Sequence, residues 1–134
     1  MKKAYIAIKF HENCRNRDLI EKISEALEKN GIKHICMIRD HEKWGTVKFT
    51  PKELMKKTFQ EMEKADVLIV EITEKGVGIG IEAGYAYAKG IPIIVIAKHG
   101  SDISNTMKGI AKEVFLYHSL KDLDDFFKKL STFV

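Results

Sequence analysis

The sequence predicts an α/β fold: a single-domain, doubly wound parallel sheet of five strands with helices on both faces. Short apolar runs alternate along the chain with longer helical patterns, which is typical of such a sheet. Two of the runs, 66–72 and 92–97, are rich in Val, Ile and Leu, as expected for strands that helices cover on both sides. Because crossover connections are right-handed, we expect the flavodoxin-like strand order 2-1-3-4-5.

The first third of the chain predicts two strands and one helix. The apolar run at 4–10 predicts the first strand. The segment 17–31 repeats its apolar residues at helical spacing and ends in Asn30-Gly31, a C-terminal cap signal. The run KHICMI at 33–38 predicts the second strand, and the polar segment 39–49 predicts a loop.

The next helix is expected at 50–65, because Thr50 can act as its N-cap, Pro51 can occupy its first position and Glu53 can complete a capping box. The third strand follows at 66–72. The remaining expected elements are a helix at 79–90 that Gly90 closes, a strand at 92–97, a loop or short helix at 101–109, a strand at 113–118 and a helix at 120–134.

The composition is that of an ordinary soluble globular chain. Of its 134 residues, 45% are hydrophobic and 31% charged, and we expect one domain over residues 1–134. The longest apolar stretch is far shorter than the roughly 20 residues of a membrane span, and the N-terminus lacks the features of a signal peptide. We therefore expect a cytoplasmic protein that does not act at a membrane. The two cysteines show no metal-ligand spacing, and we expect neither a metal nor an organic cofactor.

The net charge of +4 is mildly basic and suits an anionic small molecule as partner. Lysines and glutamates are interspersed along the chain, which is typical of solvated helix faces. Because no basic stripe with interleaved aromatic residues occurs, we do not expect the protein to bind nucleic acid.

The stretch KGVGIGIEAGYAYAKG, residues 75–90, places Glu82 among several glycines. In a doubly wound sheet, ligands bind beyond the carboxyl ends of the strands, at the switch point between the first and third strands. The loops at 9–16, 39–49 and 71–80 are therefore where a site is expected, and the glycines begin in the third of them.

Three interpretations of this stretch are open. Residues 78–83, GIGIEA, match a dinucleotide-binding fingerprint, but that fingerprint belongs after the first strand and needs an acid about 20 residues further on, which this chain lacks. Alternatively, Gly80 and Gly84 share a helix face and would let the helix approach the sheet closely. Finally, Glu82 is either a first-turn acid favoured by the helix dipole or a nucleophile that attacks an electrophilic sugar carbon.

The stretch 65–98 resembles the core signature of the nucleoside 2-deoxyribosyltransferase superfamily, which includes the 2'-deoxynucleoside 5'-monophosphate N-glycosidases. The family pattern is an Ala/Asn-Asp pair that opens a strand, a loop, the motif G-x-G-x-E-x-G-x-A, and then a Gly before a second apolar strand. The matching residues here are Asp66, Gly78, Gly80, Glu82, Gly84, Ala86 and Gly90.

The resemblance implies that Glu82 attacks the anomeric carbon of a nucleoside or a nucleoside 5'-monophosphate, so that the base leaves and a glycosyl-enzyme ester forms. Water or a second base then takes up the sugar. The resemblance also implies a substrate site that contains Gly76, Gly78 and Gly80. Basic residues near the pocket suit a phosphate and favour hydrolysis over transfer.

Two positions depart from the family pattern. Thr58 stands where the family usually has Asp, and Gly76 stands where it has Asp or Ser. A substitute acid/base is therefore expected, and we predict Asp40 in this catalytic role, with His41 and Glu71 also facing the switch point. The alternative is a catalytically impaired nucleotide-binding protein on the same scaffold.

Further residues are expected to complete the substrate site. Lys9, Phe10 and His11 follow the first strand, where Lys9 and His11 could bind a phosphate or a carboxylate. Tyr85, one turn beyond the expected nucleophile, lines the pocket or packs in a dimer interface. Ser104 aligns with a serine that, in the monophosphate hydrolases, reaches the phosphate of a neighbouring subunit, and this implies a homodimer with shared sites.

Overall fold

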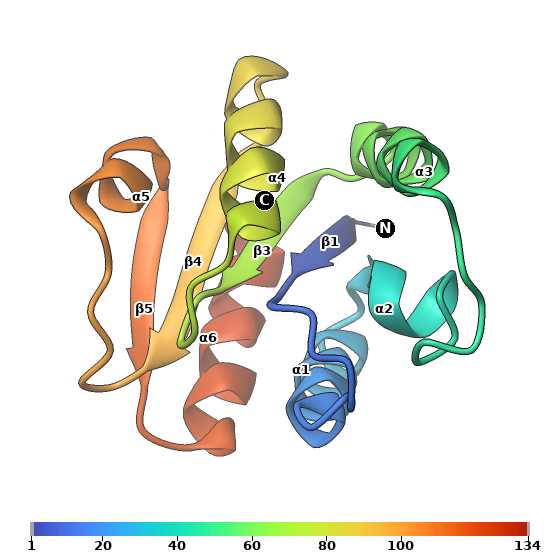
Figure 1. Cartoon of the computed structure of the whole chain (residues 1–134). Helices are drawn as coiled ribbons and strands as arrows, with labels where there is room; N and C mark the ends of the chain where they lie inside the picture. The colour runs from blue at the N-terminus through green and yellow to red at the C-terminus, as the bar shows by residue number, and fades with distance from the viewer. Residues whose placement is uncertain (1, 134) are drawn as a thin grey trace.

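The strands form one five-stranded parallel sheet in the predicted order β2-β1-β3-β4-β5 (Figure 1). The computed structural model describes residues 2–133. Pairing of β1 with β3 runs from Ala4 opposite Val67 to Ala7 opposite Val70, all in parallel register. The strands are β1 Lys3–Ala7, β2 Lys33–Ile35, β3 Val67–Glu71, β4 Ile93–Lys98 and β5 Glu113–Tyr117.

Helices cover both faces of the sheet, as predicted. Figure 1 shows α3, α4 and α5 above the sheet and α1 and α6 below it. None of the helices within residues 2–133 combines the length and the apolar character that crossing a membrane requires. The helices are α1 Arg17–Lys29, α2 Met37–Asp40, α3 Pro51–Glu63, α4 Val77–Ala88, α5 Asn105–Ile110 and α6 Leu120–Phe133.

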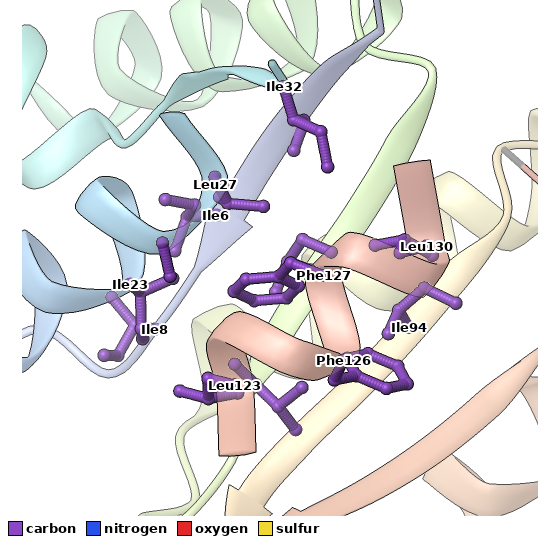
Figure 2. Packing of buried hydrophobic residues seen from close by; sticks show 14 of the residues in the cluster. Ile6, Ile8, Ile23, Leu27, Ile32, Ile94, Leu123, Phe126, Phe127 and Leu130 are labelled. Atoms are coloured by element: carbon purple, nitrogen blue, oxygen red, sulfur yellow. The ribbon is translucent and has the colours of Figure 1, made fainter. Parts of the chain in front are cut away.

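The core on the α1 and α6 face is aliphatic and aromatic. Ile6 and Ile8 of the β1 segment, Ile94 of β4, and Phe127 of α6 pack together there (Figure 2). Alternate residues of the same strands point to the opposite face, where Tyr5, Leu68 and Val95 pack against α3, α4 and α5. Because both faces are buried, β3 is apolar except for its last residue, Glu71, and β4 is apolar except for its last residue, Lys98, which confirms the interpretation of these two runs.

The start of α3 forms as its sequence predicts. Thr50 accepts a hydrogen bond from the backbone N–H of Glu53, and the Glu53 side chain accepts one from the backbone N–H of Thr50. This capping box fixes where α3 begins and so directs its inner face, which carries Thr58 and Met62, towards the sheet.

The predicted second strand is shorter than expected. Only Lys33–Ile35 pairs with β1, and the chain then turns into the single helical turn α2. The carboxylate of Asp40 accepts a hydrogen bond from the backbone N–H of Cys36, at 2.9 Å, at the point where the strand would have continued. The prediction of a strand to residue 38 and a loop from residue 39 was therefore wrong, because a side chain takes up a backbone donor that the sheet would otherwise use.

Helix α4 contacts the sheet with a different face from the one predicted. Its buried residues are Ile79, Ala83 and Ala86, whereas Gly80 and Gly84 are exposed. A Cβ atom added at either glycine would meet no other part of the molecule within 4 Å. The expectation that these glycines allow a close approach to the sheet was therefore wrong: alanines, not glycines, provide the close contact.

Candidate active site

A cavity of about 300 Å³ opens beside the carboxyl end of β1, between α3 and α4. It lies at the switch point, because β1 continues to α1 below the sheet while β3 continues to α4 above it (Figure 1). Its walls come from β1 and the loop after it, α2 and its neighbours, α3, and the first turns of α4. The lining residues are Tyr5, Ile6, Ile8, Lys9, Phe10, Cys36, Met37, Ile38, Glu42, Leu54, Met55, Thr58, Gly76, Val77, Gly78, Ile79 and Glu82.

Glu82 is the carboxylate on the α4 side of this cavity. It lies in the second turn of α4, and its Oε2 accepts a hydrogen bond of 2.5 Å from the phenol of Tyr5 on β1. Tyr5 is only 1% exposed. Thr58, on α3, lines the same cavity, and its hydroxyl opposes the rise in the pKa of Tyr5. Three elements therefore each place a polar group on the cavity: Thr58, Tyr5 and Glu82.

Burial sets the electrostatics of these groups. Loss of solvent raises the pKa of Glu82 to about 7, and the hydrogen bond from Tyr5 opposes that rise because it stabilises the charged form. Burial, followed by the charge of Glu82, raises the pKa of Tyr5 above its ordinary value. Tyr5 therefore stays protonated and acts as a donor, and Glu82 changes its charge near neutral pH.

The N-terminus of α4 faces the same cavity. Gly76 is its N-cap residue and makes no side-chain cap, and residues 76–79 all line the cavity. The first N–H groups of a helix have no partner within the helix, and their partial positive charge favours a bound anion. Lys9, which also lines the cavity, donates to the carbonyl of Lys75 at 3.1 Å just before this turn. A cation and free backbone donors thus lie side by side.

Several residues predicted for the site lie on this cavity. The structure brings together Glu82, Lys9, Phe10, Gly76 and Gly78. Gly80 does not line the cavity, because the helix rotates it to the exposed face.

Asp40, predicted as the catalytic acid/base, does not line the cavity. Its carboxylate is bound by the guanidinium of Arg39, with both N···O distances 2.8 Å, and by the backbone N–H of Cys36. Burial raises the pKa of Asp40, but these hydrogen bonds outweigh that effect and hold the pKa below its usual range. Its place in the structure favours a role in shaping α2. His41 likewise turns away, with its Nε2 3.4 Å from the carboxylate of Glu61.

His11 and Glu71 lie at the same end of the sheet but outside the cavity. His11 contacts the carboxylate of Glu74 at 3.1 Å. Glu71 is buried and accepts hydrogen bonds from the backbone and hydroxyl of Thr73 and from the phenol of Tyr117. Both side chains are therefore occupied by structural contacts.

Tyr85 and Ser104 are also placed outside the cavity. Tyr85 stacks on Phe59 with ring centroids 4.1 Å apart, and its hydroxyl donates to Glu63 at 2.6 Å, so that it joins α4 to α3. Ser104 is the N-cap of α5, and its hydroxyl accepts a hydrogen bond from the backbone N–H of Met107.

Sequence reasoning missed two of the ionisable groups on the cavity, Tyr5 and Glu42. Tyr5 lies within the first predicted strand, where an aromatic residue is ordinary core material. Glu42 lies in the segment 39–49, which was expected at the site, but nothing in the sequence singled it out. Within residues 2–133, no group of three or more His, Cys, Asp or Glu side chains is arranged to hold a metal ion.

Comparisons with known proteins identify the family of the chain. The family model described as nucleoside 2-deoxyribosyltransferase matches residues 4–122. A protein of Thermofilum pendens, described as a putative 2'-deoxynucleoside 5'-phosphate N-hydrolase 1, is 28% identical over 97% of this chain and 93% of its own length.

Two solved structures are similar in fold. The 2-deoxyribosyltransferase of Bacillus psychrosaccharolyticus superposes with a TM-score of 0.73 at 16% identity, covering 92% of this chain and 90% of that one. The CMP N-glycosidase of Clostridium botulinum gives a TM-score of 0.70 at 19% identity, covering 99% and 100%. Because the family match spans most of the sequence, the chain belongs to the nucleoside 2-deoxyribosyltransferase family.

Proposed function

We propose that this protein cleaves the N-glycosidic bond of a nucleoside or a nucleoside 5'-monophosphate, with Glu82 as the nucleophile. The observation that carries the proposal is the placement of Glu82: its carboxylate lies on a cavity at the switch point and is held by the phenol of Tyr5. Family members are deoxyribosyltransferases or N-glycosidases, which supports an enzymatic role for this site.

The proposed reaction has two steps. In the first, an Oε atom of Glu82 forms a bond to the anomeric carbon, the bond from that carbon to the base nitrogen breaks, and its electron pair leaves with the base. In the second, water or another base attacks the same carbon, and Glu82 leaves as a carboxylate. The hydrogen bond from Tyr5 keeps the Glu82 side chain oriented between the two steps.

A phosphorylated substrate suits the cavity better than an unphosphorylated one. The free N–H groups at the start of α4 and the ammonium of Lys9 together provide positive charge beside Gly76 and Gly78. The Thermofilum pendens relative is described as acting on 2'-deoxynucleoside 5'-phosphates, and the Clostridium botulinum protein as acting on CMP. Both names support a nucleoside monophosphate as the substrate and water as the acceptor.

The outer face of α4 supports a homodimer. Val77, Ile81 and Tyr87 are exposed by 84%, 49% and 61%, and they share this face with Gly80 and Gly84. Cβ atoms added at these glycines would meet nothing within 4 Å in the chain. The glycines therefore let another protein surface approach the backbone of α4 closely. A second copy packed here would stand next to the mouth of the cavity, beside Val77 and Gly78.

One experiment tests the proposed chemistry. The wild-type protein is incubated with a panel of nucleosides and nucleoside 5'-monophosphates, and released base is measured by chromatography. We expect release by the wild type and a loss of at least about 1,000-fold in Glu82→Ala and Glu82→Gln, because neither variant can form the ester. The variant Asp102→Asn, altered at an exposed carboxylate that pairs with Lys75, is the matched control and should retain activity.

Two positions favour a second function. Thr58 lacks the carboxylate that the family pattern has there, and Gly76 lacks the carboxylate or hydroxyl of the family's Asp or Ser. On this alternative, the protein binds nucleotides without cleaving them. Tight binding of a monophosphate, measured by calorimetry, together with no base release from any substrate would favour the binding protein and exclude the enzyme.

A further inference from the structure

The proposed cleavage needs a proton as well as a nucleophile. When the bond to the sugar breaks, the electron pair stays on the base, and most bases leave slowly unless they are protonated. Thr58 and Gly76 both line the cavity and supply no carboxylate. This inference rests on the proposed function and asks which group of this chain supplies the proton.

The ionisable side chains that line the cavity within residues 2–133 are few. They are Tyr5, Lys9, Cys36, Glu42 and Glu82. Burial raises the pKa of Tyr5 and brings that of Cys36 to about 11, so neither gives up a proton near neutral pH. Lys9, held by the carbonyl of Lys75 beside the start of α4, is assigned to the phosphate. With Glu82 as the nucleophile, Glu42 is the group left to exchange a proton.

Glu42 is a half-buried carboxylate on the side of the cavity formed by the segment after α2. The negative charge of Glu42 raises the pKa of Glu82, so the two carboxylates of the cavity interact electrostatically. Burial raises the pKa of Glu42 above its usual range, and the charge of Lys48 opposes this effect. Because the charge of either carboxylate disfavours ionisation of the other, the pair holds one proton over a range of pH, and a general acid requires the form with that proton on Glu42.

The backbone around Glu42 is built to hold it in place. The next three residues, Lys43, Trp44 and Gly45, all have positive φ angles, of 47°, 58° and 87°. For the two that are not glycine, this conformation is unfavourable because the Cβ atom crowds the following carbonyl oxygen.

Contacts with the rest of the protein offset that strain. The backbone N–H of Trp44 donates to the carbonyl of Ile38 at 2.8 Å, and the indole ring lies 4.4 Å from the guanidinium carbon of Arg17. The backbone carbonyl of Glu42 accepts hydrogen bonds from the backbone N–H groups of Gly45 and Val47. The backbone N–H of Glu42 donates to the carbonyl of Met37 at 2.9 Å. Strained backbone that its surroundings hold in place is typical of functional positions.

We propose that Glu42 is the general acid/base of this site. In the first step its carboxyl proton passes to the departing base as the bond between the anomeric carbon and the base nitrogen breaks, and the base leaves neutral. In the second step the Glu42 carboxylate takes a proton from the attacking water. The resulting hydroxyl oxygen bonds to the anomeric carbon, Glu82 leaves as a carboxylate, and Glu42 is again protonated.

The test compares two leaving groups. One substrate is an ordinary purine nucleotide of the kind that the wild type cleaves, and the other is its N7-methylated form. The methylated base carries a fixed positive charge and therefore leaves without accepting a proton. We expect Glu42→Gln to lower kcat about 100-fold or more on the ordinary purine, with KM little changed, and to lower it only a few-fold on the methylated one. Glu82→Gln should lose activity on both.

Further variants separate the role in proton transfer from a structural one. Glu42→Asp keeps the acid and should recover part of the lost rate, and circular dichroism melting checks that each variant is folded. Glu113→Gln, changed at an exposed carboxylate where β5 begins, is the matched control. An equal loss on both substrates, or no loss on either, would overturn the role of Glu42. If the wild type releases no base from any nucleoside or nucleoside 5'-monophosphate of the panel, the proposed function itself is wrong.

Discussion

At the scale of single residues, Tyr5 and Glu82 control each other's protonation. In the proposed reaction Glu82 can attack only as a carboxylate, whereas burial favours its neutral form. The phenol of Tyr5, which stays protonated because burial and the charge of Glu82 raise its pKa, donates to that carboxylate and partly restores its charged form. The pH at which Glu82 becomes charged therefore depends in part on this hydrogen bond.

Removal of that hydrogen bond should shift the pH dependence of the reaction. In Tyr5→Phe the pKa of Glu82, about 7 in the wild type, should rise, because a group that stabilises the charged form is lost. The acidic limb of kcat/KM against pH should then move to higher pH, with the largest loss of rate below pH 7 and a smaller loss at alkaline pH. Tyr87→Phe, at an exposed tyrosine of the same helix, should leave the profile unchanged. The same fractional loss at every pH would contradict this account.

The residues of the site differ in how visible they are in the sequence. Glu82 could be predicted because it belongs to a contiguous motif, and Lys9 and Phe10 because they directly follow a strand at the switch point. Tyr5 could not be assigned, since its role arises from a contact with a residue 77 positions away. The position of Glu42 depends on a turn in which the next three residues take left-handed conformations. The contacts with Arg39 and Cys36 that hold Asp40 outside the cavity are likewise not evident from the sequence alone.

At the scale of elements, the start of α4 is the proposed binding site for the phosphate of the substrate. Gly76 has an extended backbone, with φ at −160°, which any residue can adopt. A Cβ atom there would meet the side chains of Ile79 and Lys9 at 3.7 and 3.8 Å, which are ordinary contacts. The glycine is therefore not required by the fold, and a larger residue can stand at the N-cap.

We therefore expect Gly76→Ser to fold normally and to bind phosphate more tightly. The serine hydroxyl can cap α4, which should leave stability unchanged or raise it by a few tenths of a kcal/mol. It also adds a donor beside Lys9, so KM for a nucleoside 5'-monophosphate should fall, while KM for the matching nucleoside should not. Thermal melting and steady-state kinetics measure both effects. Gly109→Ser, at an open position in α5, serves as the control, and equal changes of KM for both substrates would contradict a phosphate site at this helix end.

Most elements could be predicted because their signals are local. The capping box placed the start of α3 to within a residue, and the apolar runs identified β3 and β4 with small errors at their ends. The run at 33–38 failed because its apolar residues are buried in α2 as well as in β2, so that burial alone did not distinguish strand from helix. Likewise, spacing showed that Gly80 and Gly84 share a face but could not say which face meets the sheet.

At the scale of the whole molecule, the open question is what covers the outer face of α4. Exposed apolar residues beside small ones favour contact with another protein surface, and the proposed occupant is a second copy of the chain. Such a contact would bring residues of the partner next to the cavity.

A charge on this face should separate the subunits. We expect the wild type to sediment as a dimer and Ile81→Glu to sediment as a monomer, because the new carboxylate would be buried without a partner in the interface. Val114→Glu places the same charge at an exposed apolar residue of β5, an edge strand of the sheet, and should remain a dimer. A wild type that sediments as a monomer at micromolar concentration would contradict the proposal. Base release measured on Ile81→Glu shows whether the partner completes the site.

The separation of Tyr5 and Glu82 in the chain has a consequence for how activity is acquired during folding. Before β1 pairs with β3, Glu82 is an ordinary glutamate in water, with neither the phenol nor the apolar wall beside it. Pairing between strands so distant in sequence forms late and slowly compared with local helices. Recovery of base release after dilution from denaturant should therefore lag behind recovery of helical signal, and the enzyme's own turnover becomes a probe for assembly of its sheet.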